Sequence, residues 1–290
     1  MMRGTLHLVT ASDYLAFRSC LQPMLTATLR GVLRERAKAL EVEQLTASAR
    51  RFFDQEPRTF EELRERLRSE HPRGDERAMG YAVRMHLPLV QVPTDAAWGF
   101  PGTADFAVAE SWLGQPLADE PSPEALVRRY LAAFGPASVA DAQTWSGLGA
   151  LAEVFERLRP GLRTFSDERG KELFDLPKAP RPSEDTRAPA RFLPEFDNLV
   201  LAHADRSRLI SDADRPKIFY PNLAIPPTFL VDGIVSGTWK IVRKGKAATL
   251  SISPFGSLTK SSRAELLDEA ERLVRFVEEE ATSHQVRVDR

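Results

Sequence analysis

The chain has 290 residues, of which 42% are apolar, and a formal net charge of −1. This length allows one to three domains, and the balanced charge excludes a uniformly basic surface, so nucleic-acid contacts would need local basic patches. A single cysteine excludes internal disulfides and fits a reducing compartment. The sequence has no signal peptide and no run of about 18–20 apolar residues, which predicts a soluble, cytoplasmic protein without a membrane partner.

The chain opens with a segment typical of a β-strand. Residues 3–9, RGTLHLV, have this pattern, and no partner strand precedes them. Thr10 with Asp13 marks the start of a helix, and Pro23 opens a second one. We interpret residues 1–42 as the remnant of a first module, a wing strand plus helices. Either the start codon is placed too late or the chain is naturally shortened.

Residues 43–115 are expected to form a complete module of three helices and a hairpin. Thr59 and Glu62 make a capping box, which marks the start of the second helix. The expected elements are helices at 43–54, 56–69 and 75–87, a strand at 87–94, a loop at 96–103 and a returning strand or short helix at 105–112.

The same order appears again in residues 120–177. The expected elements are helices at 123–135, 138–147 and 148–159 and a hairpin at 162–177. Ser138 with Asp141 forms a second capping box, 79 positions after the first. Three helices followed by a β-hairpin is the order of a winged helix, a variant of the helix-turn-helix DNA-binding unit. The repeat therefore predicts tandem winged-helix modules.

The C-terminal part is predicted to be a separate domain. Residues 178–190 are rich in proline and charge, as in a linker, and residues 191–290 follow as one domain. Asp232–Gly233 is a hairpin turn between apolar runs, residues 243–246 (RKGK) are a second turn, and together they predict a three-stranded meander. A last helix is expected near Ser262, with Glu265 closing its capping box. The predicted fold class is α+β.

Few residues carry recognisable chemistry. The five histidines are far apart, without metal-ligand spacing, and the chain has no P-loop, no dinucleotide-binding motif and no nucleophile elbow. We therefore expect no metal and no cofactor. Asp197, flanked by Phe196 and Leu199, is a weak candidate for a catalytic carboxylate, and the alternative is that it caps a turn.

Two groups of cations suit a DNA backbone. Arg206 and Arg208 lie two apart, and four cations crowd one hairpin: Lys240, Arg243, Lys244 and Lys246. The alternative for the hairpin is protection of a strand edge against aggregation. The third helix of the first module adds Arg77 and Arg84, whereas the equivalent helix of the second carries Glu153 and Glu156, so base reading by these helices is not expected.

Four stretches together are similar to one known family: 2–14 (MRGTLHLVTASDY), 128–148 (RRYLAAFGPASVADAQTWSGL), 192–208 (FLPEFDNLVLAHADRSR) and 231–241 (VDGIVSGTWKI). They resemble winged-helix DNA-binding proteins of the AlkZ-like (YcaQ-like) DNA glycosylase superfamily over nearly the whole chain. The resemblance implies tandem winged helices and a C-terminal β element around a DNA-binding concavity. It also implies metal-free excision of bulky alkylated bases or unhooking of interstrand crosslinks.

The family's catalytic feature is a Gln-x-Gln or Gln-x-Asp motif that positions the attacking water, upstream of the RGTLHLV strand. None of the seven glutamines has Gln or Asp two residues later. We therefore expect a protein that binds double-stranded DNA, damaged or intact, and is catalytically incomplete as given. The alternatives are a non-enzymatic, regulatory DNA-binding protein and a winged-helix module that binds protein.

Overall fold

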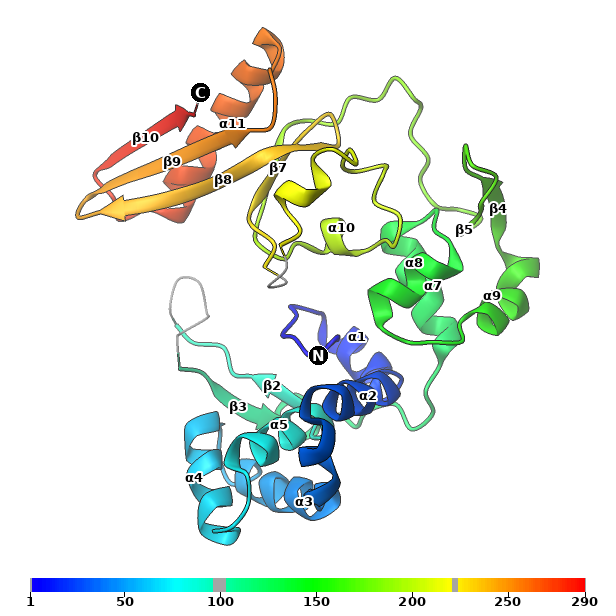
Figure 1. The fold of residues 1–290 in the computed structure, drawn as a ribbon, viewed down its shortest axis with the longest axis vertical. Coiled ribbons are helices and arrows are strands. Elements are labelled where there is room, and N and C mark those ends of the chain that lie inside the picture. The colour runs from blue at the N-terminus through cyan, green and yellow to red at the C-terminus, as the bar shows by residue number, and fades with distance from the viewer. Residues whose placement is uncertain (1, 96–102, 221–223, 290) are drawn as a thin grey trace. The chain divides into compact units, whose positions relative to one another are not determined.

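The computed structural model describes residues 2–95, 103–220 and 224–289 (Figure 1). The chain divides into two compact units. Unit 1 contains residues 1–131 and 146–161, and unit 2 contains residues 132–145 and 162–290. The division into modules and linker at residues 42, 115, 177 and 190 is finer than this and stays a prediction.

Unit 1 begins with a turn in place of the predicted strand. Arg3 and Gly4 have positive φ angles, and Met2 forms an isolated bridge with Thr5. Residues 6–9 form neither helix nor strand, and Leu6 and Leu8 are 63% and 92% exposed. The strand prediction for residues 3–9 is therefore wrong. An alternating apolar segment becomes a strand only when a second strand pairs with its N–H and C=O groups, and none of the described residues does so here.

The first helices of unit 1 start as predicted. Helix α1 (Ala11–Phe17) is capped by Thr10, whose side chain accepts a hydrogen bond from the Asp13 amide. Helix α2 (Gln22–Leu33) has Pro23 in its first turn, and the 3₁₀ helix η1 (Arg34–Ala39) follows it. None of the described helices is long and apolar enough to cross a membrane.

Residues 42–113 have their helices and strands in the order predicted for a winged helix. Its elements are α3 (Val42–Phe53), β1 (Arg58–Thr59), α4 (Phe60–Glu70), α5 (Glu76–His86), β2 (Leu89–Gln91), β3 (Asp105–Val108) and α6 (Ala109–Leu113). The three strands form one antiparallel sheet in the order β1-β3-β2. Thr59 and Glu62 form the predicted capping box at the start of α4. The predicted loop at 96–103 lies, except for Thr103, outside the described residues.

The predicted second copy has the same element order. Its elements are α7 (Pro123–Phe134), α8 (Val139–Ser146), α9 (Ala152–Leu158), η2 (Arg159–Gly161), β4 (Arg163–Ser166) and β5 (Glu172–Asp175). Ala137, just before α8, pairs with Phe174 of β5, as Arg58 before α4 pairs with Phe106 of β3. In both copies a short strand pairing thus precedes the capping box, so their similarity extends beyond the order of the elements.

Unit 2 is built on a five-stranded sheet. Its strands are β6 (Arg191–Leu193), β7 (Thr228–Val231), β8 (Ile234–Lys244), β9 (Ala247–Pro254) and β10 (Ser283–Val288). The predicted meander forms its centre, and Asp232 and Gly233 both have positive φ at the β7–β8 turn. β10 adds to the edge of β9 in parallel, and β6 adds to β7 antiparallel.

Helix α11 (Lys260–Val277) covers one face of this sheet (Figure 1). Leu266, Ala270 and Val274 pack there with Phe229 and other apolar strand residues. A smaller cluster on β7 and β8 includes Val200 of α10 (Asn198–Leu201) and Ile218, which follows η3 (Arg215–Lys217). Residues 178–190 form no helix or strand.

The predicted cap of α11 is wrong. The helix starts three residues earlier than expected, and the Thr259 side chain accepts a hydrogen bond from the Ser262 amide. Glu265 therefore lies beyond the first turn, where no unpaired amide needs it. Its carboxylate instead accepts a hydrogen bond from the Ala190 amide and pairs with Arg187, which ties the linker to α11.

Candidate nucleic-acid interface

The β8–β9 hairpin presents one open face. Successive residues of a strand point to opposite faces, so Trp239 and Ile241 pack toward the core while Lys240 and Lys244 lie on the other side and are exposed. Lys240 is in register with Ser251 of β9, and Ser251 with Arg287 of β10. The Arg287 Nε donates a hydrogen bond of 2.8 Å to the Ser251 Oγ. Three cations thus lie on one sheet face, and of these Arg287 also lies 3.7 Å from the Asp289 carboxylate.

The cations at the hairpin tip differ in whether acidic side chains pair with them. Arg243 lies on the core side and pairs with Glu278 at 3.3 Å and Glu280 at 3.4 Å, so its charge is compensated. Lys244 and Lys246 are exposed on either side of Gly245, which has a φ of +59°. Of the hairpin cations predicted to bind DNA, Lys240, Lys244 and Lys246 are therefore better placed than Arg243.

The segment 203–208 (HADRSR) is held against α8 and the residues just before it by four hydrogen bonds. The His203 Nε2 lies 3.1 Å from the carbonyl oxygen of Phe134. The amides of Ala204 and Asp205 both donate to Oδ1 of Asp141, at 2.9 and 3.2 Å. The Arg208 guanidinium donates to the Pro136 carbonyl at 3.1 Å. These contacts fix the backbone that carries the two predicted arginines.

Asp141 is the centre of this arrangement. Its side chain is 1% exposed, and its second oxygen accepts hydrogen bonds from the amide and hydroxyl of Ser138, at 2.8 and 2.7 Å. Burial raises the pKa of this carboxyl, but the hydrogen bonds from Ser138 and Asp205 outweigh it and hold the pKa below its usual value. Asp141 is thus an anion that joins the α8 cap to segment 203–208.

Arg206 is held by its own side chain as well. Its Nε donates to the Val200 carbonyl at 2.9 Å, and its Cζ lies 4.7 Å from the centroid of the Phe219 ring. Arg208 is exposed beside it. A guanidinium fixed by a ring and a carbonyl keeps its terminal N–H groups for a ligand.

The two arginines predicted on α5 of unit 1 differ from each other. Arg77 is exposed in the first turn. The Arg84 Cζ lies 4.5 Å from the centroid of the Phe60 ring, and burial together with the charge of Arg64 lowers its pKa. Arg84 is therefore partly used in packing against α4.

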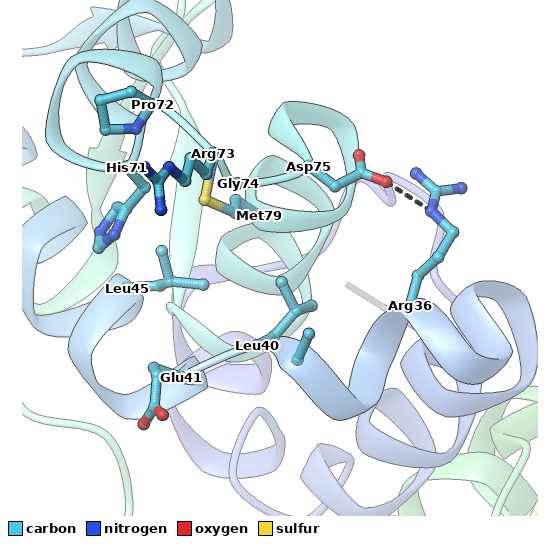
Figure 2. Close-up of a pocket in the computed structure, with 11 residues that line it drawn as sticks. Arg36, Leu40, Glu41, Leu45, His71, Pro72, Arg73, Gly74, Asp75 and Met79 are labelled. Carbon is cyan, nitrogen blue, oxygen red and sulfur yellow. Dashed lines mark hydrogen bonds and ion pairs between the residues drawn. The ribbon is translucent and has the colours of Figure 1, made fainter.

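A cavity of about 610 Å³ lies where α4 turns into α5 (Figure 2). Its floor is apolar, with Leu40, Leu45 and Met79. At its rim, Asp75 accepts hydrogen bonds from the Ala78 amide and from Arg36, and the Arg36 contact holds the pKa of Asp75 below its usual value. This carboxylate serves as a helix cap and ion-pair partner, so the cavity has no free base for catalysis at that position.

Comparisons with known proteins agree with this architecture. The family described as DNA glycosylase AlkZ-like matches residues 1–276. The chain belongs to this family. It is 26% identical over 287 residues to the "Interstrand DNA cross-link repair glycosylase" of Streptomyces sahachiroi, covering 88% of this chain and 71% of that protein.

The fold of this AlkZ-like chain also matches a solved structure. The Streptomyces sahachiroi DNA glycosylase AlkZ superposes with a TM-score of 0.75 and 23% identity, over 99% of this chain and 80% of the other. At this identity the match concerns the fold, which is mixed α+β in both. The α+β prediction and the family resemblance are confirmed.

Asp197, the weak catalytic candidate, caps a helix. Its Oδ1 accepts a hydrogen bond of 2.8 Å from the Leu199 amide at the start of α10. This is the structural alternative that the sequence left open. Among the residues that the structure describes, no three His, Cys, Asp or Glu side chains come together as a metal site.

Three residues of the interface were not singled out from sequence. Asp141 was interpreted only as a cap, although its neighbours on both sides are apolar or small, which is a signal for burial. His203 starts the segment that contains Arg206 and could have been grouped with it. Arg287 could not have been found, because its position beside Ser251 depends on the long-range pairing of β10.

Proposed function

We propose that this AlkZ-like chain binds double-stranded DNA mainly through the phosphate backbone, in a DNA-repair context. The observation that carries the proposal is the open sheet face with Lys240, Lys244 and Arg287. Exposed cations spaced along a sheet face suit a row of phosphates, and such contacts supply affinity without reading sequence. Family membership supports DNA as the ligand.

The third helix of each copy supports backbone binding over base reading. Arg84 packs on Phe60, which leaves Arg77 as the freer predicted cation of α5. On α9, Arg157 pairs with Glu124 at 2.6 Å, and the adjoining Arg159 pairs with Glu156 at 2.7 Å. A major-groove helix needs donors directed at base edges, and paired arginines are poor ones.

We further propose that residues 1–290 bind damaged DNA without releasing a base. The relative's name, interstrand DNA cross-link repair glycosylase, supports cross-linked duplex as the ligand to test. The sequence has no Gln-x-Gln or Gln-x-Asp to position a water against a sugar carbon. The Asp197 carboxylate, which accepts the Leu199 amide as a helix cap, is a poor substitute for that motif.

A binding titration at several salt concentrations tests the proposal. Each phosphate neutralised contributes about 0.9 to the slope of log K against log salt, so the open face should give a slope of about −2 to −3. Changing Lys240 and Lys244 to Gln should lower both affinity and slope. A duplex affinity that is absent, or indifferent to salt, would reject DNA binding.

The catalytic part needs a separate assay. The chain is incubated with a duplex carrying an alkylated purine or a crosslink, and abasic sites are measured. We expect none above the rate of spontaneous depurination. Base release at enzymatic rates would contradict the second proposal while leaving the first intact.

A further inference from the structure

Two guanidinium groups of unit 2 share one aromatic ring. The Cζ of Arg206 lies 4.7 Å from the centroid of Phe219, and the Cζ of Arg215 lies 5.9 Å from the same centroid. The two arginines are nine positions apart and come from different elements, segment 203–208 and η3. The fold therefore brings together two like charges that the sequence separates.

The charge of the buried Asp141 favours the charged form of Arg206, but both oxygens of that carboxylate are already bonded to Ser138, Ala204 and Asp205. Within the described part of the chain, neither Arg206 nor Arg215 forms an ion pair. Two of the acids close in sequence are used elsewhere: Asp214 pairs with Lys217 at 2.6 Å, and Asp205 accepts a hydrogen bond from the Ser207 amide. Burial lowers the pKa of Arg206, and the charge of Arg215 lowers it further. The half-buried Arg206 and the exposed Arg215 repel each other in the free protein.

The Arg206 side chain is held in place, and the fold places the backbone of Arg215. Arg206 is fixed by its Nε bond to the Val200 carbonyl and by the anchoring of its segment on Asp141. Arg215 starts η3, directly before Ile218, which is fully buried. Two neighbouring guanidiniums, of which that of Arg206 is fixed, suit an anion with several oxygens, because each planar fork can donate two parallel hydrogen bonds.

We propose that Arg206, Arg215 and Phe219 form a binding site for one phosphodiester group of the DNA backbone. This site rests on the proposed DNA binding and would be one of its backbone contacts. The Phe219 ring serves as the platform for the guanidiniums, so the site offers positive charge and hydrogen-bond donors. Arg215 is the new residue, and no sequence signal set it apart.

The test compares Arg206→Gln, Arg215→Gln and the double variant with a charge-matched control, Arg263→Gln. Arg263 is exposed near the start of α11, and its side chain has no partner among the described residues. We expect each single variant to bind duplex about 10- to 100-fold more weakly, a range usual for a charge-assisted contact. Because both arginines serve one phosphate, the double variant should lose about 0.9 of the salt slope, not twice that, with a non-additive affinity loss.

A second readout separates this role from a structural one. Removing the charge of Arg215, whose side chain forms no hydrogen bond or ion pair among the described residues, should leave the melting temperature of the DNA-free protein unchanged or raise it. If Arg215→Gln lowers the melting temperature in the way that it lowers affinity, the pair is structural and the proposal fails. Arg215→Lys keeps the charge but not the fork, and should retain the salt slope with a weaker affinity.

The outcomes distinguish the two proposals. Wild-type protein that does not bind duplex rejects the proposed function. Wild-type protein that binds, with Arg206→Gln and Arg215→Gln behaving as Arg263→Gln does, rejects this site alone. Inorganic phosphate could raise the melting temperature while Arg215→Gln leaves the duplex affinity unchanged. That result would show a site for free anions and would also overturn the assignment to DNA.

Discussion

Replacing Asp141 by Asn should destabilise unit 2 strongly, because one carboxylate satisfies four donors. They are the amide and hydroxyl of Ser138 and the amides of Ala204 and Asp205. Asn keeps one oxygen and turns an NH₂ toward the other pair of donors. At least one buried amide then loses its partner.

The magnitude follows from the two hydrogen bonds that Asn cannot replace. A hydrogen bond to a charged group contributes about 1.5–3 kcal/mol, so we expect a loss of about 3 kcal/mol in the free energy of unfolding. Glu62→Gln is the matched control in the first copy. Glu62 caps Thr59 in the same way, but its side chain is 42% exposed and water can replace the lost acceptor, so the loss should be clearly smaller.

Urea denaturation followed by tryptophan fluorescence measures both variants, at neutral pH and in acid. The pKa of Asp141 is lower in the folded chain than its usual 3.8, so its contribution is present above about pH 4 and disappears as pH falls through the folded pKa. The difference between wild type and Asp141→Asn should therefore shrink in acid. Equal losses for the Asp141 and Glu62 variants, or a difference independent of pH, would refute the reasoning.

Three more perturbations have defined outcomes. Gly237→Ala places a Cβ 2.5 Å from the Ser253 carbonyl oxygen and against the Phe229 ring, and should lower the free energy of unfolding, measured in urea, by about 1–3 kcal/mol. Gly256→Ala is the control: the space around Gly256 is open, so the free energy of unfolding should change by less than about 0.5 kcal/mol. Burial raises the pKa of Tyr14 to about 12, so wild type should lose stability between pH 10 and 12 in alkaline denaturation, and Tyr14→Phe should not show that loss. Lys240→Gln alone should reduce the salt slope of duplex binding by about 0.9.

Local signals in the sequence were sufficient for much of the fold. The capping boxes of Thr59 and Ser138 each use residues within one helical turn, and both form. Asp232–Gly233 adopts the two positive φ angles of a hairpin turn, for which its residue types are suited. In each case the stabilising contact lies within four residues, so no knowledge of distant partners was needed.

Contacts between distant segments explain what could not be predicted. RGTLHLV alternates like a strand, yet no described segment pairs with it. Ser262 and Glu265 have capping-box spacing, but Thr259 starts the helix earlier. The reach of Asp141 to residues 63 and 64 positions away, and the shared ring of Arg206 and Arg215, arise only when the loops fold together.

The parallel pairing of β10 has a consequence for handling the protein. Ser283–Val288 covers the outer edge of β9 from Ala247 to Ile252, and the amides of Thr282 and Ser283 donate to the Lys246 carbonyl at the hairpin tip. Removing these last strand residues would leave β9 as a bare edge with Leu250 and Ile252 behind it. Such an edge is a template for strand addition between copies, so proteolytic trimming or a C-terminal fusion that displaces β10 should turn a well-behaved preparation into an aggregating one.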